Sequence, residues 1–301
     1  TQRPVGVLMA AGCLTGAGYI IHNVMAAPFF MRNSTPQERL HLFGVNYALE
    51  VLASVAGVSR LTLETWDGSE PSGTRIEVQG GSEARTTKFY TDLYHALLGR
   101  RTVSDVDGSY LDNTGEQPVA RKIPSEEGAP RYAHHNSDAF WGAQWTLNVL
   151  WPLAYPVKTH DFCNTLVDGY KNGGLIPRGP TGGNYSFVMI APTSTPVLVS
   201  AYQKGIRGFD VEAAYEGMVV NHGPGGLMSK AGYEHDTCEG GGVEYYIERG
   251  YVPLGIEAFA FHCDGAAQTL EYAYCDGCLA EMARALGKEA DARRFGERAL
   301  N

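Results

Sequence analysis

Three segments of this 301-residue chain gather side chains that bind or transform polar ligands, and they span residues 132–145, 173–185 and 233–246. The first, Y-A-H-H-N-S-D-A-F-W-G-A-Q-W, combines imidazoles, an amide, a carboxylate and two indoles. The second, G-G-L-I-P-R-G-P-T-G-G-N-Y, holds Arg178 on a loop stiffened by proline and glycine. The third, Y-E-H-D-T-C-E-G-G-G-V-E-Y-Y, suits a solvated acidic loop and a functional loop equally. Helix capping and core packing explain single members of the first segment but not the whole set.

The carboxyl groups in and near these segments suit glycoside hydrolysis. That reaction needs one protonated and one ionised carboxyl group, held at a separation that sets the stereochemistry. The candidates are Asp138, Glu239, Glu244, Glu271 and Asp276, and their spacing selects no pair. The sequence has no G-x-S-x-G elbow, no Walker loop and no G-x-G-x-x-G between a strand and a helix, so it does not support those chemistries.

Two cysteines form a C-x-x-C motif at Cys275 and Cys278, a spacing also found in redox and zinc sites. Apolar residues recur around Cys275 at intervals of three and four, which places it on the buried face of a helix. A zinc site would need a second ligand pair, and Cys238, His262 and Cys263 have no standard spacing. We therefore predict buried free thiols and assign no metal ligand.

The composition predicts a globular protein that does not bind nucleic acid. The chain is 44% hydrophobic and 19% charged, and its formal net charge is −9 without a basic stripe. No run reaches the roughly 18 apolar residues that a membrane-spanning helix needs. Residues 1–30 weakly resemble a lipoprotein export signal, but the first residue is Thr, so we favour a trimmed start over an intact signal.

The elements that must position these residues change character near residue 81. We interpret residues 1–81 as the end of a β-rich domain plus a linker, with a helix at 36–56 and strands at 60–65 and 74–78. Residues 82–301 have helical periodicity, beginning at an N-cap at Ser82. The later helices are predicted near 138–151, 157–171, 193–204, 209–221, 242–249, 265–286 and 288–300.

Short and long connections alternate between these predicted helices. The connections 99–136, 172–192 and 222–264 are long, whereas a few residues join 193–204 to 209–221. Such alternation is typical of stacked antiparallel helix hairpins, with the functional loops on one rim. We predict a mostly α fold, an α-solenoid or an α/α toroid, and no sequence period supports a TPR-like or HEAT-like array.

Seven blocks in the same order resemble glycoside hydrolase family 92. They are R-I-E-V-Q-G-G-S (75–82), K-F-Y-T-D-L-Y-H-A-L-L (88–98), S-D-V-D-G-S-Y (104–110), N-G-G-L-I-P-R (172–178), K-G-I-R-G-F-D-V-E-A-A (204–214), R-G-Y-V-P (249–253) and T-L-E-Y-A-Y-C-D-G-C-L-A (269–280). The resemblance implies a β-sandwich followed by an (α/α)6 toroid, calcium dependence and inverting exo-hydrolysis of α-mannosides. It also implies a periplasmic or extracellular location.

The resemblance assigns a substrate-binding rim to this chain. Arg178 matches the basic residue of the family's G-G-x-x-P-[RK] loop, and Glu271 and Asp276 match its T-L-E-Y-A-Y-x-D helix. The predicted substrate-binding residues are His134, His135, Asp138, Trp141, Gln144, Trp145, Arg178, Asn184, Glu239 and Glu271. Two departures affect the predicted sugar: Q-W-T at 144–146 replaces W-D-T, and N-Y-S-F at 184–187 replaces N-E-T-G.

The family's toroid has more helices than this sequence supplies. The resemblance places the general acid and base in later motifs, so we expect the catalytic pair beyond Asn301 and an incomplete toroid within the chain. The rest of a longer polypeptide, or a complementing chain, would then complete the ring. A non-catalytic glycan-binding module and a helical scaffold for protein partners are the alternatives.

Overall fold

The computed structural model describes residues 60–64, 75–137, 140–143, 146–185, 189–230, 241–254 and 265–300. All of them belong to one compact unit, residues 55–301. This part of the chain is mostly helical with a few short strands, as predicted. The helix predicted at 36–56 lies outside the described residues, and the domain boundary at residue 81 stays a prediction. No helix among the described residues combines the length and the apolar character needed to cross a bilayer.

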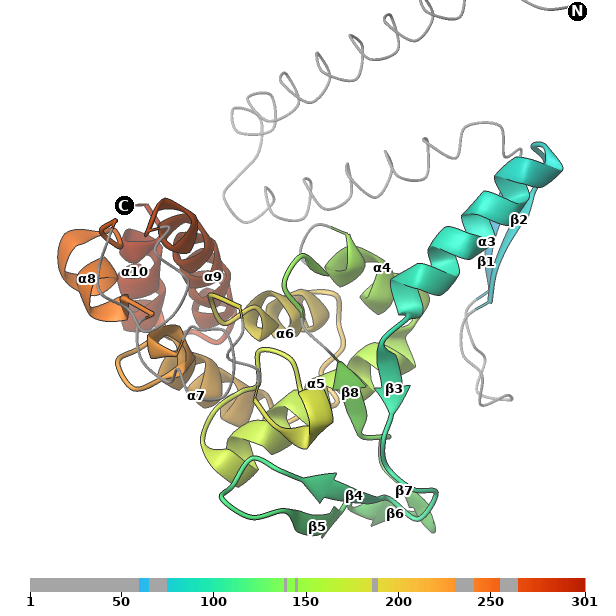
Figure 1. Cartoon of the computed structure of the whole chain (residues 1–301), viewed down its shortest axis with the longest axis horizontal. Coiled ribbons are helices and arrows are strands. Elements are labelled where there is room, and N and C mark those ends of the chain that lie inside the picture. Colours follow the sequence, from blue (N-terminus) through green and yellow to red (C-terminus); the bar gives the residue numbers. More distant parts are fainter. Residues whose placement is uncertain are drawn as a thin grey trace, which may run out of the picture. The chain divides into compact units, whose positions relative to one another are not determined.

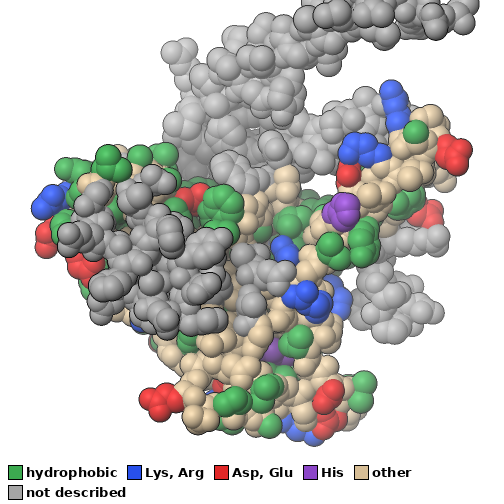
Figure 2. Space-filling view, viewed as in Figure 1, with side chains coloured by type: hydrophobic (Ala, Val, Ile, Leu, Met, Phe, Trp, Pro, Cys, Tyr) green, Lys and Arg blue, Asp and Glu red, His purple; other side chains and the backbone are tan. Residues whose placement is uncertain are grey.

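The first described elements are a two-stranded ribbon and a helix. Strand β1 (Arg60–Glu64) pairs antiparallel with β2 (Arg75–Gln79), which confirms both predicted strands. Helix α3 (Glu83–Leu97) follows, and its Tyr90 hydroxyl accepts a hydrogen bond from the Val78 backbone N–H at 3.3 Å. The helix buries no residue fully, and charged and hydrophobic side chains lie beside one another along it (Figure 2).

The predicted long connection at 99–136 consists of short antiparallel pairs. Strand β3 (Arg100–Thr102) pairs with β8 (His135–Ser137), across 35 residues. Between them lie two hairpins, formed by β4 (Ser109–Asp112) with β5 (Val119–Lys122) and by β6 (Ser125–Glu126) with β7 (Ala129–Pro130). The sequence shows no strong alternation in these short strands, so we did not predict them.

The helix predicted at 138–151 is wrong in its first half. Helix α4 (Leu147–Ala154) begins nine residues later than predicted. Strand β8 brings an extended backbone up to Ser137, and Gly142 has a φ of 81°. A residue with positive φ cannot continue a right-handed helix, so the helix begins only after this turn.

The remaining helices lie at the predicted positions, but the predicted pairing of 193–204 with 209–221 is not among the extensive helix contacts. They are α5 (Pro156–Gly173), α6 (Ser194–Gln203), α7 (Val211–Asn221), α8 (Val243–Arg249), α9 (Gly265–Ala285) and α10 (Glu289–Arg298). Helix α6 packs against both α4 and α9, and α5 packs against α7, which gives one row of α4, α6 and α9 and a second row of α5 and α7. The most extensive contact between two helices is that of α9 with α10, which form the last hairpin and lie side by side (Figure 1).

Local chemistry explains the helix ends. Helix α5 runs two residues past its predicted end, to Gly173, and is capped by Gly174, whose φ of 85° is left-handed. The Asp210 carboxylate caps α7 by accepting a hydrogen bond from the Ala213 N–H at 3.1 Å. Both cysteines of the C-x-x-C motif are free and buried in α9, and burial raises the pKa of Cys278 to about 12. A protonated buried thiol is not nucleophilic, so the predicted packing role is confirmed.

Two helix glycines provide a test of this packing. A Cβ at Gly217 in α7 would lie 2.7 Å from Ile176 Cγ1, whereas one at Gly277 in α9 would lie 3.7 Å from Ala299 Cβ. We expect Gly217→Ala to lower the free energy of unfolding by about 1 to 3 kcal/mol through overpacking. The matched change Gly277→Ala should raise it by about 0.5 to 1 kcal/mol, because alanine restricts the unfolded chain. Urea unfolding measures both, and equal effects would contradict the close crossing at Gly217.

Candidate functional site

Buried polar side chains without a hydrogen-bond partner lie near the starts of α4, α6 and α9 in the described part of the chain. Asn148 lies in the first turn of α4, Thr193 and Ser194 begin α6, and Gln268 and Glu271 lie in the first two turns of α9. Each has at least one buried oxygen or nitrogen atom without a hydrogen-bond partner among the described residues. An unpaired buried polar atom costs about 1 to 3 kcal/mol, and most native proteins contain few of them. Because α6 contacts both α4 and α9, this set marks a candidate site for a polar ligand.

The predicted site residues Trp141 and Glu271 lie together at this site. The Trp141 side chain hydrogen-bonds to the Glu271 carboxyl group and is 47% exposed. Burial raises the pKa of Glu271, and the bond from Trp141 opposes that rise. An exposed indole beside a half-buried carboxyl group is suited to a sugar, because the ring packs on apolar C–H groups while the carboxyl pairs with hydroxyls.

Arg178, the third of the predicted residues near this site, is completely buried. Its Nε donates to the Ala191 carbonyl at 2.5 Å, and its Nη2 donates to the carbonyls of Leu227 at 3.1 Å and Lys230 at 2.9 Å. Burial lowers the pKa of Arg178 to about 10, so the guanidinium keeps its charge at neutral pH. Arg178 therefore joins three chain segments behind the site, and its predicted contact with substrate stays a prediction.

The segment that leads into α6 is conformationally strained. Ala191 is fully buried and has a φ of 61°, a left-handed conformation that is unfavourable for a residue with a Cβ atom. Such strain costs about 1 to 3 kcal/mol and is found preferentially at functional sites, where the surrounding structure maintains it. Here the bond from Arg178 holds the Ala191 carbonyl, directly before Thr193 and Ser194.

The two predicted histidines lie elsewhere, between β8 and α5. The His134 ring stacks on Tyr110 with centroids 3.9 Å apart, and its Nδ1 lies 3.5 Å from Asp168 Oδ2. The Nε2 atom of His135 lies 3.3 Å from Asp161 Oδ2. Both imidazoles are buried, so in the described part of the chain they fasten the strand to the helix. Their contact with substrate stays a prediction.

Of the other predicted site residues, only Asn184 lies in the described part of the chain. Asn184 is exposed, and its Oδ1 accepts a hydrogen bond from the Tyr185 N–H at 2.6 Å. Four further predictions lie outside the described residues: Asp138, Gln144, Trp145 and Glu239. Within the described ranges, no group of three or more His, Cys, Asp or Glu side chains could hold a metal ion.

Sequence reasoning missed four residues of the site, namely Asn148, Thr193, Ser194 and Gln268. Ser, Thr and Asn are common at helix starts because their side chains cap the helix, so their presence there carried no functional signal. In this structure neither Thr146, the N-cap of α4, nor Thr193, the N-cap of α6, makes a side-chain capping bond. The absence of these two capping bonds can be seen only in the structure.

Solved structures of the same architecture are mannosidases. One is a family GH92 α-mannosidase from Bacteroides thetaiotaomicron in complex with mannoimidazole, which is 29% identical to this chain with a TM-score of 0.57. The match covers 72% of this chain and 25% of that one. A family GH92 inverting mannosidase of the same organism is 27% identical to this chain with a TM-score of 0.59. That match covers 74% of this chain and 28% of that one.

Two curated relatives match smaller parts of the chain. An uncharacterized secreted glycosidase from Arthroderma benhamiae is 27% identical over 153 residues, which are 47% of this chain and 18% of that protein. The DNA mismatch repair protein MutL from Solibacter usitatus is 34% identical over 102 residues, which are 32% of this chain and 14% of that protein. This chain thus spans less than a fifth of both curated relatives.

The match to a family model covers most of the chain. The model describes the glycosyl hydrolase family 92 catalytic domain and matches residues 47–301. It extends over all the described helices and over the candidate site at the starts of α4, α6 and α9. With the mannosidase structures at 27% and 29% identity, it confirms the resemblance seen in the sequence blocks. The chain belongs to glycosyl hydrolase family 92.

Proposed function

We propose that the chain is the front part of the catalytic domain of a glycosidase that hydrolyses α-mannosides, and that it supplies the sugar-binding rim. The observation that carries this proposal is the pairing of exposed Trp141 with half-buried Glu271, whose carboxyl group keeps one oxygen without a hydrogen-bond partner among the described residues. Because the chain spans about a quarter of the mannosidases it matches, the activity of the whole protein is part of the proposal.

The rim residues would act by binding and orienting the sugar. The indole face of Trp141 would support one face of the ring, and Glu271 would pair with its hydroxyls. Arg178 would hold the segment before α6 in place from behind.

The finer features of the proposal come from the resemblance. The two rows of helices would form the first part of an incomplete (α/α)6 toroid, preceded by part of a β-sandwich domain. Inverting hydrolysis needs two carboxyl groups about 6.5 to 9.5 Å apart with a water molecule between them. We expect that pair beyond Asn301. A location in the periplasm or outside the cell is proposed, since one relative is described as secreted.

Calcium is likewise proposed for the full-length enzyme only. A calcium ion takes six to eight oxygen ligands, usually including several carboxylates. The described residues do not fit this requirement, because none of their acidic side chains forms a group that could hold a metal ion. Its ligands would therefore come from elsewhere, and no step of the mechanism is derived through it.

A non-catalytic glycan-binding module is the second candidate. It is favoured by one observation: burial raises the pKa of Glu271 and Trp141 lowers it, and no carboxylate of the described residues is among the groups that act on it. Binding needs only this one carboxyl group, whereas hydrolysis needs two. Turnover of α-mannobiose by the full-length protein distinguishes the two candidates.

Replacing Trp141 with alanine tests the site. We expect Trp141→Ala to weaken the binding of α-mannobiose by at least about tenfold, because the stacking platform is lost. The matched control is Tyr94→Ala, which removes another exposed aromatic side chain from α3 and should leave affinity unchanged. Calorimetric titration of the full-length protein with mannose and α-mannobiose, with and without calcium, measures both. Absence of heat in the folded wild type would refute the proposed function.

A further inference from the structure

Two cationic side chains lie at the end of α6, and among the described residues neither forms an ion pair with a carboxylate. Lys204 is the C-cap of the helix, and its Nζ donates to Ser200 Oγ at 2.6 Å. The guanidinium carbon of Arg207 lies 4.4 Å from the centroid of the Tyr202 ring, and its Nε donates to the Tyr202 carbonyl at 3.4 Å. Both cations belong to the block at 204–214, for which the proposed function has no use.

The environment of Lys204 differs from that of other lysines in the described ranges. Lys171 Nζ lies 2.6 Å from Asp210 Oδ2, and Lys288 Nζ lies 3.0 Å from Glu212 Oε2. A carboxylate at that distance stabilises the protonated amine. The Ser200 hydroxyl beside Lys204 has no charge, so it gives the ammonium a hydrogen bond but no counter-ion.

The hydrogen bonds around Ser200 leave the amine of Lys204 free to react. The single proton of the Ser200 hydroxyl goes to the Asn148 carbonyl at 2.5 Å, so its oxygen can only accept from Lys204. A neutral amine has two N–H groups and one lone pair. It can give one hydrogen to Ser200 while the lone pair stays available to an electrophile.

The Lys204 side chain is partly buried and yet reachable from solvent. It extends back by one turn of α6 to Ser200, and it keeps an intermediate exposure between the exposed residues Gln203 and Gly205. Burial lowers the pKa of Lys204 to about 8. A small reagent can therefore meet an amine that is partly deprotonated near neutral pH.

The gain in reactivity has a defined size. At pH 7 about a tenth of the Lys204 amine is neutral, against about one part in 3,000 for an ordinary lysine. A weaker base is also a weaker nucleophile, with a Brønsted coefficient of about 0.4 to 0.5 for thiols. With a similar coefficient for amines, a net advantage of about tenfold remains for Lys204.

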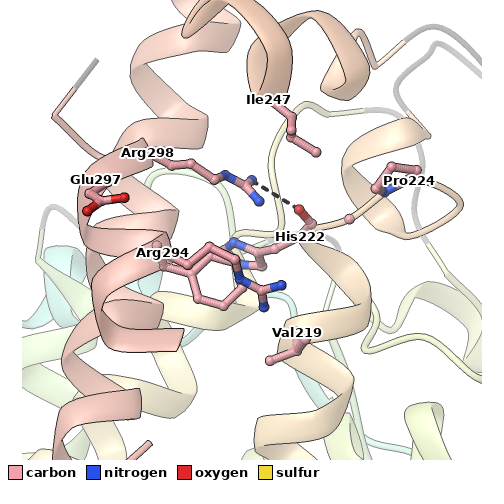
Figure 3. Close-up of a pocket in the computed structure, with 9 residues that line it drawn as sticks. Val219, His222, Pro224, Ile247, Arg294, Glu297 and Arg298 are labelled. Atoms are coloured by element: carbon pink, nitrogen blue, oxygen red, sulfur yellow. Dashed lines mark hydrogen bonds between the residues drawn. The ribbon is translucent and has the colours of Figure 1, made fainter. Parts of the chain in front are cut away.

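The arginines of the open cavity between α7, α8 and α10 show the opposite arrangement (Figure 3). Arg298 Nε lies 2.8 Å from Asp276 Oδ2, and Arg294 Nη2 lies 2.9 Å from Asp291 Oδ1. Asp276 also accepts from His222 Nδ1 at 2.7 Å, and burial keeps that imidazole neutral by lowering its pKa. The cavity of about 550 Å³ thus presents cations that are already neutralised, unlike the end of α6.

Arg207 favours an electrophile that carries negative charge. Its side chain is exposed, and the described residues use only its Nε donor and one face of the guanidinium. Guanidinium groups pair well with phosphate because their donors match its oxygens. A phosphate bound there would lie three residues along the chain from the Lys204 amine.

We propose that Lys204 is an acylation site for a small acyl phosphate, whose phosphate group pairs with Arg207. The lone pair of Nζ forms an N–C bond with the acyl carbon, and the C–O bond to phosphate breaks. The electron pair of that bond leaves with inorganic phosphate, and the proton lost from the nitrogen goes to water. No oxidant or reductant is needed. This inference goes beyond the proposed function and does not depend on it.

The first test needs no variant. The folded full-length protein is treated with acetyl phosphate, and the acetylation of each lysine is followed by peptide mass spectrometry. At pH 7 we expect Lys204 to react about tenfold faster than Lys171. Its rate should level off above about pH 8, whereas the rate at Lys171 should still rise. Equal rates at the two lysines, or the same pH profile for both, would overturn the inference.

The second test examines Arg207. We expect Arg207→Gln to slow the reaction of Lys204 with acetyl phosphate by about threefold or more, the size of an exposed ion pair. The reaction with a neutral activated acetyl ester should keep its rate, because that reagent has no phosphate. Circular dichroism checks that the variant is folded. An unchanged rate with acetyl phosphate, or an equal fall with both reagents, would overturn the pairing of Arg207 with phosphate.

Discussion

Replacing Arg178 with alanine is expected to lower the free energy of unfolding by about 4 kcal/mol or more. The guanidinium donates to the carbonyls of Ala191, Leu227 and Lys230, and the first two of these residues are fully buried. Each carbonyl left without a donor costs about 1 to 3 kcal/mol, and the lost side-chain volume leaves a cavity. Urea unfolding monitored by circular dichroism measures the change.

Two further substitutions make this result specific. Arg178→Lys keeps the charge but has a single ammonium group, which cannot reach three carbonyls with the geometry of a guanidinium, so we expect an intermediate loss. The matched control is Arg131→Ala, which breaks an exposed pair with Glu126 at 3.3 Å and should cost at most about 0.5 kcal/mol. Equal stability of the Arg178→Ala and Arg131→Ala variants would contradict the role of Arg178 in joining the segments that contain Ala191, Leu227 and Lys230.

The sequence predicted the helices well because their signals are local. The starts and ends of α5, α6, α7, α9 and α10 fall within about two residues of the predicted ones, since glycines, prolines and a capping aspartate mark them. The pairing of β3 with β8 is different in kind. It joins Arg100 to Ser137, and no local pattern in either segment identifies its partner. Because β8 extends to Ser137, α4 also begins later than predicted.

The candidate site was predicted in part, and the difference has a physical cause. The sequence indicates Trp141 by its residue type and Glu271 by its place in a family block, and the structure brings them together. Arg178 was chosen on the same grounds, yet its donors are used by backbone carbonyls. A sequence shows that a donor is present but not which acceptor it meets. The hydroxyls of Thr193 and Ser194 had no signal, because an ordinary helix start uses the same residues.

Removing the charge of Arg298 is expected to be nearly as costly as removing Arg178. The Asp276 carboxylate is fully buried, and Arg298 is its cationic partner at 2.8 Å. Arg298→Met leaves that charge buried beside a neutral imidazole, and losing one partner of a buried pair costs about 3 to 5 kcal/mol. Urea unfolding measures the loss as a lower midpoint with an unchanged slope.

A double-mutant cycle separates this pairing from simple loss of packing. Asp276→Asn removes the negative charge, so in that background Arg298→Met no longer leaves a carboxylate without its cation. We therefore expect the two changes to be non-additive by about 1.5 kcal/mol or more. The same cycle at the exposed pair of Lys288 and Glu212, 3.0 Å apart, should give at most about 0.5 kcal/mol. Additive effects at Asp276 and Arg298 would mean that Arg298 contributes through its contacts with Phe295 and Tyr246 instead.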